Sequence, residues 1–232
     1  MDIRGKVVLV TGANRGLGKA FVTALLEGGA AKVYAGARDP SSVNIPGGTP
    51  IALDITDEAS VRHAAKQASD VSVVFNNAGF LKYGSLLAED SVENLQQHLD
   101  VNTFGTLRVS RAFAPILAKQ GGGALVNVLS VLSWLSPAGA GGYSASKSAQ
   151  WGLTNGLRAE LREQNTLVIG VHPAYIDTDM VADVQAPKST PQEVVALTLQ
   201  ALAEDREEVL VSDTSHGVKA SLSSDSPVYL NY

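Results

Sequence analysis

Two side chains suited to acid-base chemistry, Tyr143 and Lys147, stand four residues apart in this sequence. At that spacing a helix places both on one face, one turn apart. A phenol with its usual pKa of about 10 exchanges protons poorly near neutrality, but a nearby ammonium favours the phenolate and brings that pKa toward working pH. Ser130 ends the apolar run 124–129, which indicates a buried strand, and its hydroxyl could hold a substrate oxygen beside Tyr143. The same spacing also arises by chance on amphipathic helices, so the pair needs support from the rest of the chain.

The composition predicts a single globular domain spanning residues 1–232. The chain is 45% hydrophobic and 18% charged, and a chain of this size buries about 70% of its unfolded surface. A net charge of -5 gives no electrostatic footprint for nucleic acid or an anionic membrane. Cysteine is absent, which suits a reducing compartment, and no apolar run is long enough for a membrane span or a signal sequence. We therefore expect a cytoplasmic protein with neither a nucleic-acid nor a membrane partner.

A glycine-rich turn joins the first predicted strand to the first predicted helix. The β-branched run 6–10 is typical of a buried parallel strand, and the segment TGANRGLG separates it from a helical pattern at 19–26. Gly12 permits the tight turn, Gly16 lets the backbone approach a pyrophosphate, and Gly18 lets helix and strand pack closely. The helix N-terminus offers free N–H groups to the phosphates. Strand, turn and helix in this order predict a dinucleotide site.

The second predicted strand, 32–37, ends at Arg38. An acidic residue here would hydrogen-bond a ribose 2′-hydroxyl, whereas an arginine accommodates a 2′-phosphate. Arg38 and Arg15, from the glycine turn, could converge on that phosphate. Asp39 could instead pair with Arg38, and surface arginines are usually only solvated. The balance favours NADP(H) over NAD(H).

The chain between 39 and 50 is too short and too rich in Pro, Gly and Ser for a full helix, so we expect a loop with at most one helical turn. A strand at 50–53 ends at Asp54, which either hydrogen-bonds an adenine amino group or caps the local turn. Thr56 or Asp57 is expected to cap the next helix.

Small and amide residues follow the fourth predicted strand, 71–75. The segment Asn76-Asn77-Ala78-Gly79 lets the backbone approach a ligand while satisfying local carbonyls, although it can also be a plain turn.

A long helix is predicted at 101–119, after a shorter one capped by Asp90 or Ser91. Asn102, near its start, either braces the structure or holds a water, and the sequence leaves both open. His63 and His98 are assigned to solvated helix faces.

The alternation of strands and helices predicts an α/β fold, a Rossmann-type doubly wound parallel sheet in three α/β/α layers. A Ser, Ala and Gly-rich connection at 131–142 leads from the strand 124–130 into a helix that continues to about 163. Ligands bind such sheets at the carboxyl ends of the strands, where the residues singled out above all lie.

Together these segments resemble the short-chain dehydrogenase/reductase family in its single-domain form. The resemblance covers roughly residues 5–180, and Tyr143 follows Ser130 by thirteen residues, as in the family. The matching motifs, in the family's order, are Thr11-Gly12-x3-Gly16-x-Gly18, Asn76-Asn77-Ala78-Gly79, Asn102, Ser130 and Tyr143-x3-Lys147.

The resemblance implies a catalytic tetrad. Tyr143 would act as general acid in carbonyl reduction and as base in alcohol oxidation, and Ser130 would position the substrate oxygen. Lys147 would bind the nicotinamide ribose and lower the pKa of Tyr143. Asn102 would hold a water that links Lys147 to solvent.

The resemblance also implies a cofactor site and a substrate loop. Residues 167–171 form the sixth strand, followed by His172, assigned to packing, and by a loop in which Ala174 replaces the family's glycine. The short segment 179–190 predicts an open pocket that admits bulky substrates. The implied cofactor residues are Gly12, Asn14, Arg15, Gly16, Leu17, Gly18, Arg38, Asp54, Ile55, Asn77, Ala78, Gly79, Tyr143, Lys147, Pro173, Ile176 and Thr178.

These features predict an NADPH-dependent carbonyl reductase that also runs as an alcohol dehydrogenase. Apolar residues near the site (Leu81, Tyr83, Leu132, Trp134 and Tyr175) suggest an apolar substrate, aromatic compounds included. The alternatives are a sugar or polyol dehydrogenase, which would want a more polar pocket, and a non-catalytic NADP-sensing protein. We expect no metal site. The family commonly pairs the helices 101–119 and 141–163 between subunits, so a homodimer or homotetramer is expected.

Overall fold

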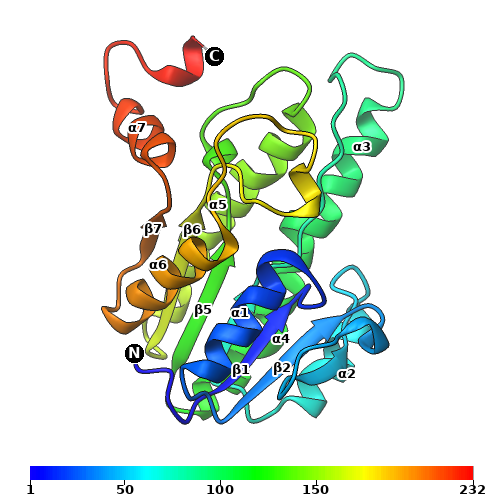
Figure 1. The fold of residues 1–232 in the computed structure, drawn as a ribbon, viewed down its shortest axis with the longest axis vertical. Helices are drawn as coiled ribbons and strands as arrows, with labels where there is room; N and C mark the ends of the chain where they lie inside the picture. Colours follow the sequence, from blue (N-terminus) through cyan, green and yellow to red (C-terminus); the bar gives the residue numbers. More distant parts are fainter. Residues whose placement is uncertain (232) are drawn as a thin grey trace.

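A seven-stranded sheet forms the centre of the computed structural model, which describes residues 1–231 (Figure 1). All neighbouring strands are parallel, in the order β3-β2-β1-β4-β5-β6-β7. The strand order reverses between β1 and β4, which makes the predicted Rossmann-type topology correct and puts the switch point at the glycine turn. The strands are β1 (Val7–Thr11), β2 (Lys32–Ala37), β3 (Thr49–Ala52), β4 (Val73–Asn76), β5 (Gly123–Val128), β6 (Thr166–His172) and β7 (Glu208–Leu210).

Helices cover both faces of this sheet, giving the three expected layers. Helices α1 and α6 pack together on one face, and α2, α4 and α5 lie on the other (Figure 1). The helices are α1 (Gly16–Glu27), α2 (Glu58–Gln67), α3 (Ser91–His98), α4 (Thr106–Lys119), α5 (Gly141–Leu161), α6 (Pro191–Ala203) and α7 (Asp213–Ser221).

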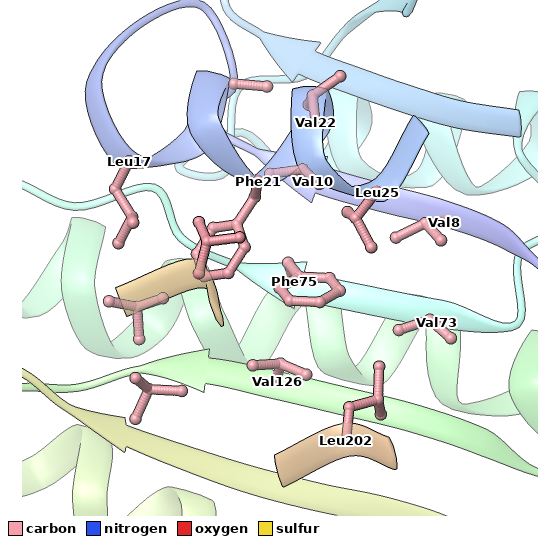
Figure 2. Close-up of a cluster of buried hydrophobic side chains, with 14 of the residues drawn as sticks. Val8, Val10, Leu17, Phe21, Val22, Leu25, Val73, Phe75, Val126 and Leu202 are labelled. Atoms are coloured by element: carbon pink, nitrogen blue, oxygen red, sulfur yellow. The ribbon is translucent and has the colours of Figure 1, made fainter. Parts of the chain in front are cut away.

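Each face of the sheet has its own apolar core, because side chains alternate sides along every strand. On the α1 side, Phe21 meets Phe75 with ring centroids 4.8 Å apart (Figure 2). Val10 of β1 lies level with Ala35 of β2 and with Phe75 of β4, which fixes the register at the switch point. Fully buried strands of this kind explain the continuous apolar runs in the sequence.

The predicted helix at 101–119 is correct in its later part and wrong at its start. A π-helical segment, Leu99–Gly105, joins α3 to α4 without a break and contains Asn102. Single π turns of this type often occur at functional sites. Asp90 precedes α3 but makes no capping hydrogen bond, because its carboxylate pairs with Lys82 2.9 Å away.

The short connections agree with their turn chemistry. A single 3-10 turn, Pro40–Ser42, is the only regular structure between β2 and β3, as expected. Asp57 caps α2 by accepting from the N–H groups of Ala59 and Ser60, which confirms that prediction.

The serine-rich tail, for which the sequence suggested no role, folds back onto the body of the protein. Helix α7 places Val218 against Trp134 and Leu135 in a third, smaller apolar cluster. Among residues 1–231, no helix combines the length and the apolarity needed to cross a membrane.

Candidate active site

Helix α5 carries Tyr143 and Lys147 near its N-terminus, on one face as the spacing predicts. The Lys147 Nζ lies 5.7 Å from the centre of the Tyr143 ring. Lys147 is only 4% exposed. Its ammonium donates to the Val128 carbonyl and to Gln150 Oε1, both at 2.8 Å.

Ser130 follows β5 and begins the 3-10 turn Val131–Ser133. Its backbone is extended, and its Oγ accepts from the Leu132 N–H at 3.1 Å. The Val131 N–H donates to the Pro173 carbonyl, which ties this turn to the loop after β6. Ser130 therefore lies where β5 and β6 end, beside the start of α5.

The predicted lowering of the Tyr143 pKa by Lys147 is not what this structure gives. Burial raises the pKa of Tyr143 to about 12, while its hydrogen bond with Ser130 acts in the opposite direction. Burial also lowers the pKa of Lys147 to about 7. Two protein acceptors hold the ammonium, and no attraction between Lys147 and Tyr143 offsets the desolvation of either group.

Asn102 is fully buried, and its side chain braces the backbone. Its Oδ1 accepts from the Phe80 N–H at 2.8 Å, and its Nδ2 donates to the Phe80 carbonyl and to Ser146 Oγ. The side chain makes no hydrogen bond to Lys147. Of the two roles left open by the sequence, the bracing role is the one these contacts support.

The glycine turn fits a dinucleotide phosphate. Gly12 and Gly16 have φ values of 62° and 52°, which glycine adopts without strain. A Cβ on Gly18 would lie 2.2 Å from the Gly12 carbonyl oxygen, so helix and turn can approach only with glycine there. No side chain caps the N-terminus of α1, and its N–H groups remain available to an anion. Leu17 is buried in the core, whereas Asn14 is partly exposed in the turn.

The segment after β4 is locked onto this turn. Thr11 Oγ1 accepts from the N–H groups of both Asn77 and Ala78 at 3.0 Å. Asn77 Nδ2 donates to the carbonyls of Thr11 and Gly12. Asn77 thus satisfies local carbonyls as predicted, and Ala78 and Gly79 lie at the switch point. Thr11 was not among the predicted site residues, although it opens the motif.

Arg15, at the N-cap of α1, and Arg38, just after β2, are both exposed. Asp39 does not pair with Arg38, because its carboxylate accepts from the N–H and hydroxyl of Ser41. Arg15 lies 4.0 Å from Asp179, and that pair is largely exposed. Exposed ion pairs contribute little to stability, so Arg15 can leave Asp179 at little cost. Both guanidinium groups can therefore turn toward an added anion.

Asp54, at the end of β3, forms a local turn. Its Oδ1 accepts from the N–H and the hydroxyl of Thr56, at 2.9 and 2.7 Å. This is the capping alternative, and the proposed adenine contact remains a prediction for the other carboxylate oxygen. Ile55 is buried against Gly105 of the π-helical segment.

The loop after β6 comes back to the glycine turn. Thr178 is the neighbour that a Cβ on Gly16 would meet, at 3.3 Å. Ile176 pairs with Ser189 in a single parallel bridge, which closes the short 179–190 segment onto the loop. Ala174 causes no strain, since the positive φ values outside glycine among residues 1–231 occur elsewhere. Thr178 is therefore next to the turn, whereas Pro173 and Ile176, on the same loop, contact Val131 and Ser189.

One predicted pocket residue is wrong. Trp134 is 8% exposed and stacks on His172 with ring centres 4.0 Å apart, so it belongs to the small cluster under α7. His172 is a packed strand-end residue as predicted, and burial lowers its pKa to about 3. Its Nδ1 donates to the Ser130 carbonyl. Leu81 and Tyr175 are half-buried, in keeping with a pocket wall, and Tyr83 is exposed. Leu132 is also half-buried, but it packs against the small cluster under α7.

His98 is also not where the sequence put it. It is fully buried, and burial lowers its pKa. Its Nδ1 lies 2.8 Å from the Asn94 carbonyl and must donate to it, so Nε2 accepts from the Lys82 N–H. Its ring packs on Phe80 and, edge-on, on Tyr143. His63 is exposed as predicted.

Gln150 was missed, although it lies three residues after Lys147 on the same helix face and is polar among apolar neighbours. No group of three His, Cys, Asp or Glu side chains within residues 1–231 is arranged to hold a metal ion.

Comparison with known proteins identifies the family. The short chain dehydrogenase family model matches residues 6–189. A short chain dehydrogenase from Burkholderia cenocepacia J2315, solved in complex with NADP, is 40% identical with a TM-score of 0.93, and the match covers 97% of this chain and 95% of that one. The 1-deoxy-11-beta-hydroxypentalenate dehydrogenase of Streptomyces exfoliatus is 32% identical over 227 residues, covering 89% of this chain and 82% of that protein.

Some relatives are longer. The short chain dehydrogenase tazN of Aspergillus terreus is 35% identical over 204 residues, which cover 80% of this chain but only 44% of tazN. The chain therefore spans less than half the length of that relative. The match over residues 6–189, together with the parallel sheet and the glycine turn, shows that this chain belongs to the short-chain dehydrogenase/reductase family of oxidoreductases.

Proposed function

We propose that this chain is an NADPH-dependent carbonyl reductase that also runs in reverse as an alcohol dehydrogenase. One observation carries the proposal. Ser130, Tyr143 and Lys147 gather at the carboxyl edge of the sheet, the edge at which the glycine turn offers an uncapped helix N-terminus to a phosphate. A site that only bound nucleotide would need no half-buried phenol beside a buried amine.

The proposed chemistry divides between cofactor and protein. NADPH, when bound, supplies a hydride to the carbonyl carbon. Ser130 Oγ holds the carbonyl oxygen, and Tyr143 donates its phenolic proton to that oxygen. Since burial raises the pKa of Tyr143 to about 12, the phenol is fully protonated at neutral pH and suited to the reductive direction.

Lys147 supports this proton transfer by its charge. A phenolate develops as Tyr143 gives up its proton, and an ammonium already fixed nearby stabilises that charge without reorganising. The same buried environment that raises the pKa of Tyr143 strengthens the attraction once the phenolate forms. Alcohol oxidation requires the reverse transfer and should therefore need higher pH.

NADP(H) is the proposed cofactor rather than NAD(H). Arg15 is exposed at the N-cap of α1, Arg38 is exposed just after β2, and Asp39 is engaged with Ser41 instead of Arg38. Two guanidinium groups suit a 2′-phosphate. The Burkholderia relative was solved with NADP, which supports the same preference.

We propose a small-molecule substrate, an apolar carbonyl or alcohol. The half-buried Leu81 and Tyr175 support this over the sugar or polyol alternative, which calls for more polar groups. The third alternative, an NADP-sensing protein, leaves the Tyr143 and Lys147 arrangement without a purpose.

We further propose a cytoplasmic homodimer or homotetramer. Phe104 is 48% exposed where the π-helical segment meets α4, which supports an interface there. Leu157 of α5 cannot contribute to a subunit interface, because it is buried in the core between helix and sheet.

The test is an assay of NADPH and NADH oxidation against a panel of apolar ketones, aldehydes and sugars. The proposal predicts turnover with NADPH and an apolar carbonyl. Turnover only with sugars would favour the polyol alternative. NADPH binding without turnover across the panel would favour the sensor and overturn the reductase.

A further inference from the structure

A chain of buried hydrogen bonds runs from Lys147 to the carbonyl of Asn102. Lys147 donates to Gln150 Oε1 at 2.8 Å, Gln150 Nε2 donates to Thr106 Oγ1 at 2.8 Å, and Thr106 donates to the Asn102 carbonyl at 2.9 Å. Gln150 is 1% exposed and Thr106 is 2% exposed. The chain therefore joins α5 to the π-helical segment and α4 through groups that water does not reach.

The orientation of the Gln150 amide follows from its partners. An ammonium has only donors, so the amide oxygen must face Lys147 and the amide nitrogen must face Thr106. Thr106 then accepts from Gln150 and donates its own proton to the Asn102 carbonyl. Every donor in the chain points away from Lys147, which leaves the negative end of each dipole directed toward the ammonium.

We propose that Gln150 is the positioning residue that holds the Lys147 ammonium in place and keeps it charged during the reaction. This inference rests on the proposed reductase function, in which Lys147 must carry its charge beside Tyr143. Gln150 touches neither the substrate nor the cofactor in this role and acts through Lys147. It supplies one of the two protein acceptors, and the Val128 carbonyl is the other.

The Lys147 ammonium needs these acceptors because few surrounding groups offset its desolvation. Burial lowers its pKa, and no carboxylate contributes in the other direction. The titratable groups facing it are Tyr143 on its own helix and His172 at the end of β6. Neither carries negative charge in the reductive ground state, so two neutral acceptors and an aligned chain of dipoles stabilise the ammonium.

One N–H group of the Lys147 ammonium is left over for the reaction. An ammonium has three N–H groups, of which two are taken by Val128 and Gln150. The third is free to face the cofactor or Tyr143. Fixing two donors orients the third, which is how a residue outside the reacting groups can affect the rate.

Two substitutions at one position separate positioning from packing. Gln150→Met keeps the length and volume of the side chain but removes the acceptor, whereas Gln150→Glu keeps the acceptor and adds a negative charge. We expect the alkaline limb of the kcat profile, measured at saturating NADPH and carbonyl, to move to lower pH in the Met variant and to higher pH in the Glu variant. The expected displacement is about one to two pH units, the equivalent of one hydrogen bond to a charged group.

A matched control lies one turn further along the helix. Thr154 is also fully buried, and its hydroxyl accepts from Asn127 Nδ2 at 3.0 Å. It donates to the Gln150 backbone carbonyl at 2.8 Å but makes no hydrogen bond to Lys147 or to the Gln150 side chain. Thr154→Val should lower stability and leave the alkaline limb where it is in the wild type. If the Met and Glu variants leave the limb unmoved, or move it in the same direction, Gln150 is only a packing residue and the inference is wrong.

A second readout does not depend on turnover. Because the pKa of Lys147 is lower in the folded than in the unfolded protein, the unfolded state binds more protons above that pKa and the free energy of unfolding rises with pH. Urea unfolding from pH 5 to 10 should show this rise beginning at lower pH in Gln150→Met and at higher pH in Gln150→Glu.

The two readouts distinguish the two proposals. A wild-type protein that reduces no carbonyl overturns the proposed function, and the unfolding series still judges Gln150. An active wild type whose Gln150 variants share its unfolding curve and its pH profile overturns the inference alone.

Discussion

The glycine turn after β1 and the cluster around Lys147 both deal with charge, and they do so with different parts of the chain. At the turn, Gly12, Gly16 and Gly18 remove side chains so that backbone N–H groups can meet an anion near the surface. Around Lys147, the polar groups are the buried Gln150 side chain and the Val128 carbonyl. Anion binding at the turn thus depends on the space left by missing side chains, whereas the charge of Lys147 depends on partners that offset its desolvation.

This difference decides how each region responds to change. A steric site fails when an atom is added to it and is insensitive to pH. A desolvated charge fails when a partner is removed, and its stability depends on proton binding. The predictions below test that contrast.

The largest loss of stability is expected from Gly18→Ala. Its new Cβ would meet the Gly12 carbonyl oxygen at 2.2 Å and Asn77 Nδ2 at 2.6 Å, so the turn has to open. We expect a cost near 3 kcal/mol, the upper part of the range for overpacking, together with loss of NADPH binding. Urea unfolding and NADPH fluorescence titration measure both effects.

The control is Gly217→Ala in α7, where an added Cβ meets nothing within 4 Å. That change should be neutral or stabilising by about 0.5–1 kcal/mol, as in an ordinary helix interior. Equal effects of the two substitutions would contradict the steric account of the turn.

Lys147→Met should remove activity and alter how stability depends on pH. We expect kcat to fall by about 10²–10³-fold, as for the loss of a preorganised charge. In the wild type the folded-state pKa of about 7 lies below the ordinary 10.5, so the free energy of unfolding rises between those values. The rise is about 1.4 kcal/mol per pH unit at its steepest, and it should vanish in the Met variant.

Exposed Lys119 is the control for this dependence of the free energy of unfolding on pH. Lys119→Met should keep the wild-type dependence on pH in urea unfolding. A slope that survives in Lys147→Met would mean that Lys147 is solvated and that its burial is not the controlling factor.

His98 tests a neutral buried group at the edge of the same region. His98→Leu leaves the Lys82 N–H without its acceptor, at an expected cost of about 1–3 kcal/mol, and His98→Gln can retain that acceptor and should cost less. Because burial lowers the pKa of His98 below 6.5, the unfolded state takes up a proton first, and wild-type stability is lost as pH falls below that value. Urea unfolding at pH 5 and 7 measures both effects, and equal stability of the Leu and Gln variants would rule out the hydrogen bond.

The smallest effect is expected from Arg38→Ala, since the side chain is exposed. We expect the Kd for NADPH to rise about tenfold, one charge-assisted interaction, while the Kd for NADH stays the same. Arg62→Ala, on the exposed side of α2, is the control. An equal change for both cofactors would remove Arg38 from the 2′-phosphate site.

The sequence predicted the fold well, and with it the glycine turn, the part of the site that consists of backbone. Buried parallel strands give apolar runs, and a glycine turn between strand and helix has few other uses, so β1, the turn and α1 could be read directly. Helical spacing placed Tyr143 and Lys147 of α5 on one face, and the motifs elsewhere in the chain supplied the support that the pair needed.

The side-chain environment was not readable in the same way. Trp134 was predicted to line the pocket and His98 to be solvated, but both are buried. An aromatic or histidine side chain suits a pocket, a core or a solvated face, and only tertiary packing decides among them. The pKa of Tyr143 was predicted to fall since sequence shows the nearby amine and not the depth of burial. Whether residues 1–232 form a single domain remains a prediction.

The most direct test of the account is the single-turnover oxidation of NADPH by Tyr143→Phe at saturating carbonyl. The substitution removes one hydroxyl and no backbone contact. The account predicts a rate at least about 10³-fold below that of the wild type, the upper range for a lost general acid, with the Kd for NADPH within a few-fold of the wild-type value. A rate within tenfold of the wild type would show that the proton comes from another group and would contradict the account.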